Sequence, residues 1–225
     1  MNISYNEVLH YLGYKGQEAD ENTMGLIDDC IAELGSIVQK KYIYDFFDLT
    51  KKDEQIILQG SILAFPGRDI KRHLQYSVRC AVMAVTLGLE VDKRIAFYSK
   101  IDLSRGMVLD ACASAAVEDL CDQVEDEIRI QASCEGLYAT SRYSPGYGDF
   151  PLEMQHKIIA TLDTYRKIGL TVTESSLLIP RKSVTAVVGL QENPPDRNRV
   201  STKCETCGNL DCVLRRDGKG CEKRS

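Results

Sequence analysis

Residues 142–147 read Arg142-Tyr143-Ser144-Pro145-Gly146-Tyr147. The segment lies between two helical patterns, and its Pro-Gly pair predicts a tight turn, because proline presets φ and glycine tolerates a positive φ. Such a turn brings backbone hydrogen-bonding groups close to a ligand. An arginine before the turn can bind a carboxylate with two parallel hydrogen bonds, and a tyrosine after it offers an aromatic wall with one hydroxyl. An ordinary surface turn with packed tyrosines is the alternative interpretation.

The sequence on either side of this turn predicts one buried strand and three helices. The apolar run 80–87 is typical of a buried central strand. Asp92 is expected to cap the helix that follows, and a long helix is expected over about 104–131. After the turn, a further helix is expected over 152–168, with Gly169 ending it.

The N-terminal part of the chain predicts two helices and a strand. Ser4 and Glu7 form a capping-box pattern before a short helix that Gly13 ends. An apolar stripe at helical spacing over 26–38 marks a second helix. The aromatic and β-rich segment 42–49 then predicts a strand.

Two predicted hairpins complete the organisation of the chain. The runs 56–58 and 62–65 predict the first hairpin, after which Asp69 is expected to cap a short helix. The β-rich runs 172–178 and 183–190, joined by a Pro-Arg-Lys turn, predict a closing hairpin. Strands thus cluster at both ends of a central helical stretch. This pattern indicates an α+β fold with a mostly antiparallel sheet and flanking helices.

The composition limits the classes of protein to which the chain can belong. The 225 residues are 44% hydrophobic and 27% charged, which is ordinary for a soluble domain with one core. The net charge of −5 argues against nucleic-acid binding, and no apolar run is long enough to span a membrane. The N-terminal residues show no signal-peptide pattern, so a cytoplasmic location is expected, and the nine cysteines are interpreted as thiols or metal ligands.

The C-terminal residues differ chemically from the body. Residues 1–190 are expected to form the main domain, 191–203 a linker and 204–225 a cysteine-rich tail. From residue 191 onward, eight Lys and Arg against six Asp and Glu give a net charge of +2, which leaves −7 for residues 1–190. The tail carries four cysteines in the spacing C-x2-C-x4-C-x8-C, namely Cys204, Cys207, Cys212 and Cys221.

Four closely spaced thiols predict a metal site in this tail. Thiolates prefer soft cations, so zinc and an iron–sulfur cluster are both candidates, and a tail without metal is the alternative. The other cysteines lie in apolar patterns and are expected in the core: Cys30, Cys80, Cys112, Cys121 and Cys134. The three histidines show no ligand spacing and are interpreted as structural or surface residues.

The turn resembles a segment of a known family. Residues 142–151 resemble the S-adenosylmethionine-binding loop of the activation domain of cobalamin-dependent methionine synthase, where an arginine and a small residue precede Pro-Gly-Tyr. The resemblance extends in order over about residues 55–190 and is absent from the tail. The further segments that carry it are Ala84-Val85-Thr86-Leu87-Gly88, Val117-Glu118-Asp119-Leu120, Thr173-Glu174-Ser175 and Pro180-Arg181-Lys182-Ser183-Val184.

The resemblance implies a set of ligand-binding residues. The S-adenosylmethionine site would comprise Glu118, Arg142, Ser144, Pro145, Gly146 and Tyr147. Arg142 would bind the ligand carboxylate, Tyr147 would form an aromatic shelf, and Glu118 would balance the positive charge of the ligand. A solvated helix residue is the alternative for Glu118, because many acids surround it. The family's N-terminal aspartate has no clear counterpart, with Asp45 and Asp48 as possibilities, and the contacts of the family's aromatic pair are either missing or rebuilt.

The resemblance also implies a function and partners. The chain would be a stand-alone reactivation module that docks on a cobalamin-carrying methionine synthase or corrinoid protein and presents S-adenosylmethionine for reductive methylation. It would act as a methyltransferase component in methionine biosynthesis, with an electron donor such as flavodoxin or ferredoxin. Two alternatives remain open. One is a reductive iron–sulfur activator of other corrinoid proteins, and the other is a non-catalytic docking protein with a zinc clip.

Overall fold

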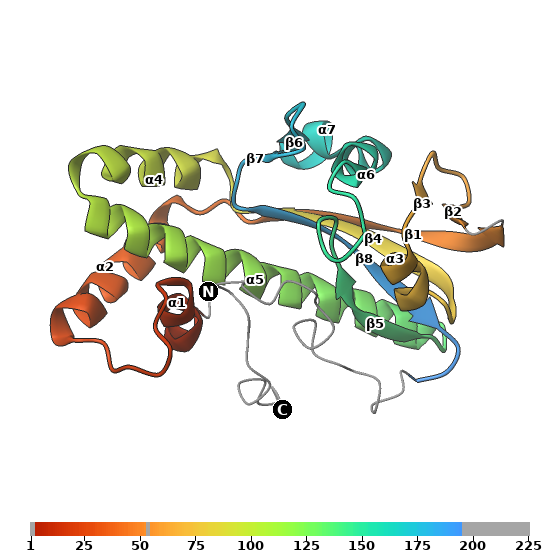
Figure 1. The fold of residues 1–225 in the computed structure, drawn as a ribbon, viewed down its shortest axis with the longest axis horizontal. Helices are drawn as coiled ribbons and strands as arrows, with labels where there is room; N and C mark the ends of the chain where they lie inside the picture. The colour runs from red at the N-terminus through yellow and green to blue at the C-terminus, as the bar shows by residue number, and fades with distance from the viewer. Residues whose placement is uncertain (1–2, 53–54, 195–225) are drawn as a thin grey trace.

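The structure is a computed structural model that describes residues 3–52 and 55–194 (Figure 1). Its helices are α1 (Tyr5–Tyr11), α2 (Glu21–Ile37), α3 (Arg68–His73), α4 (Leu89–Ile101), α5 (Leu103–Cys134), α6 (Met154–Leu162) and α7 (Thr164–Ile168). Its strands are β1 (Lys41–Lys52), β2 (Gln55–Leu58), β3 (Ala64–Phe65), β4 (Ser77–Thr86), β5 (Tyr138–Tyr143), β6 (Thr171–Val172), β7 (Leu178–Ile179) and β8 (Ser183–Gln191).

Six strands form one sheet in the order β3-β2-β1-β4-β8-β5, and every neighbouring pair is antiparallel. The two central strands β4 and β8 are buried along most of their length, because helices cover the sheet on both faces (Figure 1). Their register places Met83 opposite Ala186 and Val82 opposite Val187. The predicted α+β class with a mostly antiparallel sheet is confirmed.

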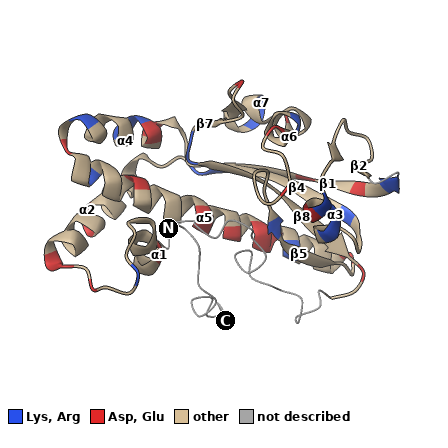
Figure 2. Ribbon diagram, in the orientation of Figure 1, with Lys and Arg blue, Asp and Glu red and all other residues tan. Residues whose placement is uncertain are grey.

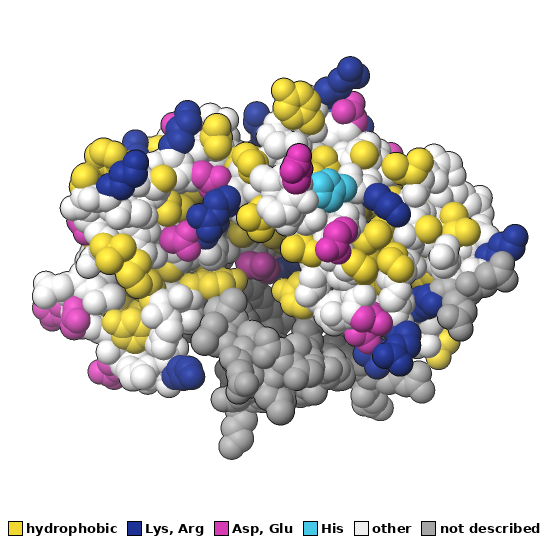
Figure 3. All heavy atoms as spheres, turned by 45° about the horizontal axis from the view of Figure 1, so that its top comes forward, with side chains coloured by type: hydrophobic (Ala, Val, Ile, Leu, Met, Phe, Trp, Pro, Cys, Tyr) yellow, Lys and Arg dark blue, Asp and Glu magenta, His cyan; other side chains and the backbone are white. Residues whose placement is uncertain are grey.

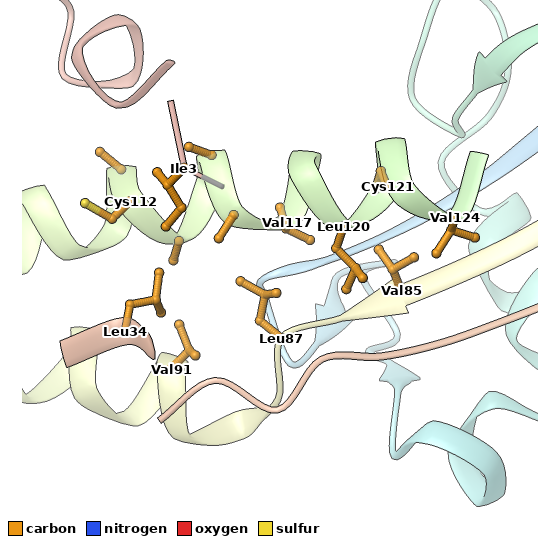
Figure 4. Close-up of a cluster of buried hydrophobic side chains, with 14 of the residues drawn as sticks. Ile3, Leu34, Val85, Leu87, Val91, Cys112, Val117, Leu120, Cys121 and Val124 are labelled. Atoms are coloured by element: carbon orange, nitrogen blue, oxygen red, sulfur yellow. The ribbon is translucent and has the colours of Figure 1, made fainter. Parts of the chain in front are cut away.

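The long helix α5 lies across one face of the sheet and forms the larger core. Asp102 caps its first turn by accepting a hydrogen bond of 3.0 Å from the backbone N–H of Arg105. Apolar side chains recur at helical spacing along α5 and pack on β4, β8 and the N-terminal helices. Figure 4 shows Leu120 of α5 beside Val85 of β4 within this core.

A second core lies on the opposite face of the sheet, beneath α6 and α7 (Figure 1). Because side chains alternate along a strand, Val82 and Val187 face this core while their neighbours face α5. The rings of Phe65 and Phe150 meet edge to face there, with centroids 5.5 Å apart. Phe150 lies just after the predicted turn, so this contact fixes the turn to the second core.

The helices α2, α4 and α5 meet at one end of the molecule around a partly buried carboxylate. Glu33 accepts a hydrogen bond of 2.8 Å from Nη2 of Arg105, pairs with Arg94, and accepts one of 3.0 Å from the Tyr98 hydroxyl. Burial opposes the charged form of Glu33, but the hydrogen bonds from Arg105, Arg94 and Tyr98 outweigh it and lower the pKa of this carboxyl. We call this group the Glu33 cluster.

Three of the predicted helix caps are wrong. Ser4 precedes α1, but its side chain makes no capping hydrogen bond. The helices α3 and α4 each begin after a glycine, so Asp69 and Asp92 lie inside their first turns. Asp92 instead accepts a hydrogen bond of 2.6 Å from the backbone N–H of Arg181. A local pattern identified these acids as helix-terminal but could not identify their distant partners.

The segment after the turn also departs from the prediction. The expected helix over 152–168 is divided into α6 and α7, because Asp163 has a left-handed conformation with φ of 51°. The closing hairpin is wrong in its pairing. The short strands β6 and β7 pair with each other, whereas β8 enters the main sheet between β4 and β5. Gly169 does end α7, in a left-handed conformation.

Most of the described cysteines are core residues, as expected. Cys30, Cys80, Cys112 and Cys121 are buried, but Cys134 at the end of α5 is exposed, which corrects that prediction. Burial raises the pKa of the Cys112 and Cys121 thiols to about 12, so both stay protonated at neutral pH. The visible face in Figure 3 mixes Lys and Arg with Asp and Glu. Within the described ranges, no helix is long and apolar enough to cross a membrane.

Candidate ligand-binding site

The segment 144–147 forms the predicted turn. The backbone N–H of Tyr147 donates to the carbonyl of Ser144 at 3.2 Å, which closes the turn around Pro145 and Gly146. Gly146 has a φ of 92°, a conformation that favours glycine. The N–H of Gly146 also donates to the carbonyl of Phe150 at 2.8 Å. The turn is therefore held by its own backbone and does not depend on tyrosine packing alone.

A reciprocal contact with α3 fixes the far end of this loop. The Asp149 carboxylate accepts hydrogen bonds of 2.7 and 2.9 Å from the backbone N–H groups of Arg68 and Asp69. It therefore caps α3 from about 80 residues away along the chain. In return, the Asp69 carboxylate accepts a hydrogen bond of 3.3 Å from the Asp149 N–H. The hydrogen bonds from the Asp69 and Arg68 backbone lower the pKa of Asp149.

Gly148 is required by this contact. A Cβ atom at this position would lie 2.2 Å from Oδ2 of Asp69 and 2.8 Å from the Tyr143 hydroxyl. Its φ of 53° is also left-handed. The loop can therefore approach α3 closely only with glycine here.

The strand β5 stops before it reaches the start of β8. Arg142 lies opposite Val188 and Tyr143 opposite Val187, so a longer β5 would place residue 145 opposite Thr185. The chain turns away instead, and among the described strands residues 183–186 pair with β4 alone. This leaves an open edge of β8 beside the turn.

Because side chains alternate along a strand, the residues beside this open edge face opposite sides of the sheet. Arg142 faces α5, like its partner Val188, whereas Tyr143 faces the second core, like its partner Val187. Thr185 lies two residues from Val187 and faces the same side. The site therefore has one wall formed with α5 and one formed with α6.

On the α5 side, the Arg142 guanidinium is surrounded by three carboxylates. Its Nη2 lies 2.6 Å from Glu118, and its Nη1 lies 2.7 Å from Asp122 and 2.9 Å from Glu125. These acids share one face of α5 because they are four and three residues apart. We call the four residues the acidic cluster. Figure 2 shows acidic residues along this part of α5.

The acidic cluster keeps Arg142 charged and leaves an excess of negative charge. Burial disfavours the charged guanidinium, but the attraction of the carboxylates, led by Glu118, raises the pKa of Arg142 above its ordinary value. One positive and three negative groups give the cluster a formal charge of −2. Arg129, which lies 2.9 Å from Glu125 at the rim, also pairs with Asp126, so these two outer residues together leave the excess unchanged. A cation is therefore favoured beside this wall.

A cleft of about 190 Å³ opens between the turn, α5 and the open edge of β8. Five of the six predicted ligand residues line it: Glu118, Arg142, Ser144, Pro145 and Tyr147. Gly146 shapes the turn but is not among the lining residues. Tyr147 is 47% exposed, which leaves its ring available as a wall. The structure thus brings residues from α5 and from the loop, more than 20 positions apart, to one place.

Sequence reasoning missed the opposite wall of the cleft, which we call the neutral wall. It consists of Gln155, Leu178, Ser183 and Thr185, whereas Val184, which also lines the cleft, packs toward the α5 core. Ser183 is already occupied, since its hydroxyl donates to the Pro180 carbonyl at 2.7 Å and also lies 2.8 Å from Thr86 Oγ1. No local signal marks Gln155, which is one polar residue of a helix. Thr185 could have been found only by placing β8 in the main sheet.

Several other candidates lie elsewhere. Asp45 and Asp48 are on β1, outside the cleft lining, and Asp48 pairs with Arg79 at 3.1 Å. His73 packs behind the loop, with its ring 5.1 Å from that of Tyr143. The four predicted metal ligands Cys204, Cys207, Cys212 and Cys221 lie outside the described residues. Among the residues that the structure does describe, no group of three or more His, Cys, Asp or Glu side chains could hold a metal ion.

Comparisons with known proteins agree with this architecture. Residues 71–195, more than half of the chain, match the family model of the vitamin B12-dependent methionine synthase activation domain. No curated protein matches the sequence. Among solved structures, the chain resembles the MetH reactivation domain bound to AdoHcy, with a TM-score of 0.65 and 16% identity over 83% of this chain and 73% of that one. At this identity the likeness shows the fold. The chain belongs to the family of vitamin B12-dependent methionine synthase activation domains.

Proposed function

We propose that this chain binds S-adenosylmethionine in the cleft and presents it to a cobalamin-carrying methionine synthase for reductive methylation. The observation that carries the proposal is the meeting of Glu118, Arg142 and the 144–147 turn around one cleft with an excess of negative charge. S-adenosylmethionine combines a sulfonium and an ammonium with one carboxylate. A wall with three acids and one arginine provides both kinds of partner.

The residues of this wall have separate roles in the proposal. Glu118 is 41% exposed at its side chain, so its carboxylate is available to balance the positive charge of the ligand. Arg142 uses Nη1 twice and Nη2 once for the acidic cluster. Of its five N–H donors, this leaves Nε–H and one on Nη2 for the ligand carboxylate. Tyr147 would cover the bound ligand with its ring.

The partner and the electron come from outside this chain. Cobalamin supplies the methyl-accepting cobalt when it is bound to the partner protein, and a flavodoxin or ferredoxin would supply the electron. The residues of this chain bind the methyl donor and fix its orientation, so no general acid or base is needed. Membership of the activation-domain family supports a role beside a cobalamin domain.

The test is calorimetric titration of S-adenosylmethionine into anaerobically purified protein, with its visible spectrum recorded beforehand. We expect saturable binding with one ligand per chain. A protein that does not bind S-adenosylmethionine but carries a brown, reducible chromophore would contradict the proposal and support a reductive activator of corrinoid proteins. Absence of both binding and colour, with the cobalamin-carrying partner also present, would support a docking protein.

The cysteine-rich tail stays a separate prediction. We propose that Cys204, Cys207, Cys212 and Cys221 bind one metal centre, either zinc or an iron–sulfur cluster. Replacing Cys204 and Cys207 with serine is expected to remove the metal and leave the affinity for S-adenosylmethionine unchanged. Metal analysis of the purified full chain would measure this, and full metal content in the double variant would contradict the proposal.

A further inference from the structure

Two oxygen atoms of the neutral wall are buried without a hydrogen-bond partner. Gln155 Oε1 and Thr185 Oγ1 belong to a small set of such atoms in the described residues, and only these two belong to residues that line the cleft. A buried polar atom without a partner costs about 1–3 kcal/mol. Thr185 is only 2% exposed, so solvent does not compensate it. A ligand that supplies hydrogen bonds to both atoms would recover this cost.

These two residues lie apart from the acidic cluster. Thr185 is three positions along β8 from Val188, which lies opposite Arg142, and this corresponds to roughly 10 Å along a strand. Thr185 faces the α6 side, where Gln155 lies in the first turn of α6, whereas Arg142 faces α5. Neither Gln155 nor Thr185 carries a charge. The cleft therefore has a charged wall on the α5 side of the sheet and a neutral wall on the α6 side.

S-adenosylmethionine likewise has one charged part and one neutral part. Its methionine part carries the sulfonium, the ammonium and the carboxylate, whereas its adenosine part is neutral and presents two ribose hydroxyls and an amino group. We infer that Gln155 and Thr185 bind the adenosine part and so orient the ligand, with its methionine part against the acidic cluster. The amide oxygen of Gln155 accepts a hydrogen bond from the nucleoside, and the Thr185 hydroxyl donates or accepts one. This inference rests on the proposed function.

The ligand must open the wall to reach these atoms, because both are shielded from solvent in this structure. The neighbouring Tyr147 can provide this opening. It is half-exposed, and its ring lies 6.1 Å from that of Tyr143 on β5, so opening the wall would replace this ring contact with contacts to the ligand. Movement of Tyr147 on binding is part of the inference.

The experiment uses two probes, S-adenosylmethionine and 5′-methylthioadenosine, which keeps the nucleoside and lacks the amino-acid part. Thr185→Val has nearly the same shape and lacks the hydroxyl. We expect it to weaken the binding of both probes about tenfold, which corresponds to one lost hydrogen bond of about 1.4 kcal/mol. Gln155→Leu should have a similar effect. Arg142→Ala should weaken S-adenosylmethionine only.

Thr161→Val is the matched control. Thr161 Oγ1 is also buried without a partner and lies on α6, but Thr161 does not line the cleft. Removing an unpaired hydroxyl should leave the melting temperature of both threonine variants unchanged or raised, which separates a binding role from a structural one. Wild-type affinity for both probes in Thr185→Val and Gln155→Leu would overturn this inference and leave the proposed function standing. Failure of the wild-type protein to bind S-adenosylmethionine would overturn the proposed function and this inference with it.

Discussion

The Glu33 cluster and the acidic cluster are two groups of charged residues that contact α5 at different points, with the central and surrounding charges reversed. Near the start of α5, one carboxylate lies between two guanidiniums and a tyrosine hydroxyl, and Asp29, 3.8 Å from Arg105, brings the formal charge from +1 to zero. Further along α5, one guanidinium lies among three carboxylates, which gives −2. In both clusters the central residue is mostly buried, with 12% of the Glu33 side chain and 15% of the Arg142 side chain exposed.

The difference between them separates a structural ion pair from a candidate binding site. The Glu33 cluster joins α2, α4 and α5, and none of its members lines the cleft. The acidic cluster joins α5 to β5 and has two members in the cleft wall, Glu118 and Arg142. Buried charge alone therefore does not indicate a binding site here. The acidic cluster is the better candidate because its charge is unbalanced beside a cleft, and the excess remains available for a ligand.

Arg142→Ala should have the largest effect of any single change. It leaves three carboxylates without their cation, so we expect the free energy of unfolding to fall by about 3 kcal/mol. The affinity for S-adenosylmethionine should also fall by about 2 kcal/mol, because a charge-assisted contact is lost. Urea unfolding and calorimetry measure the two effects. Arg129→Ala, at the exposed rim of the cluster, is the control, and wild-type affinity in Arg142→Ala would remove the charged wall from the site.

Glu33→Gln tests the other side of the comparison. It keeps the shape of the side chain but removes the charge between Arg94 and Arg105. We expect the free energy of unfolding to fall by about 2 kcal/mol, less than for a fully buried pair because Arg94 is 40% exposed. The affinity of the folded protein for S-adenosylmethionine should not change. A weaker affinity would show that the two clusters are coupled along α5.

Glu118→Gln tests whether the excess negative charge contributes to ligand binding. The change reduces the formal charge of the acidic cluster from −2 to −1. We expect S-adenosylmethionine to bind about 1 kcal/mol more weakly and S-adenosylhomocysteine, which lacks the sulfonium charge, to be less affected. Asp126→Asn, an exposed acid on the same helix, is the control. Equal losses for both ligands would mean that Glu118 acts through shape or hydrogen bonding.

Asp149→Ala should have the smallest effect, and one that depends on pH. The pKa of Asp149 is lowered in the folded protein, so its carboxylate stabilises the fold above the ordinary carboxyl pKa. This contribution disappears as pH falls through the lowered value. We therefore expect the variant to melt a few degrees below wild type near neutral pH, with the gap closing in acid. Thermal scans over pH measure it, and a gap independent of pH would contradict the capping role.

The local parts of the site could be predicted from the sequence. Pro145 and Gly146 determine the turn by their own backbone preferences, so its geometry follows from two residues. Glu118 and Arg142 were predicted as ligand-binding residues through the resemblance, and the structure places them 2.6 Å apart in one cleft, a contact that was not predicted. The roles of Asp122 and Glu125 were hidden, although they share a face of α5 with Glu118. The intervening acids Asp119 and Asp126 made the whole stretch resemble a solvated surface.

The parts that were missed depend on long-range pairing. The runs 172–178 and 183–190 have strand composition, but composition does not say that 183–190 lies between β4 and β5. Without that pairing, neither Thr185 nor the neutral wall can be located. The cap of α3 fails for the same reason, since Asp149 supplies it from a distant loop. Such contacts are decided by packing of the whole fold rather than by neighbouring residues.

The open edge of β8 has a consequence for self-association. Unpaired strand edges are templates on which a second chain can add a strand, and proteins commonly block them with proline or a covering loop. Pro145, which has no N–H to donate, is the residue that a longer β5 would place opposite Thr185. The turn can therefore keep the edge free for a small molecule while discouraging an intruding strand. We therefore expect Pro145 to disfavour the pairing of a second chain with this edge, in addition to shaping the turn.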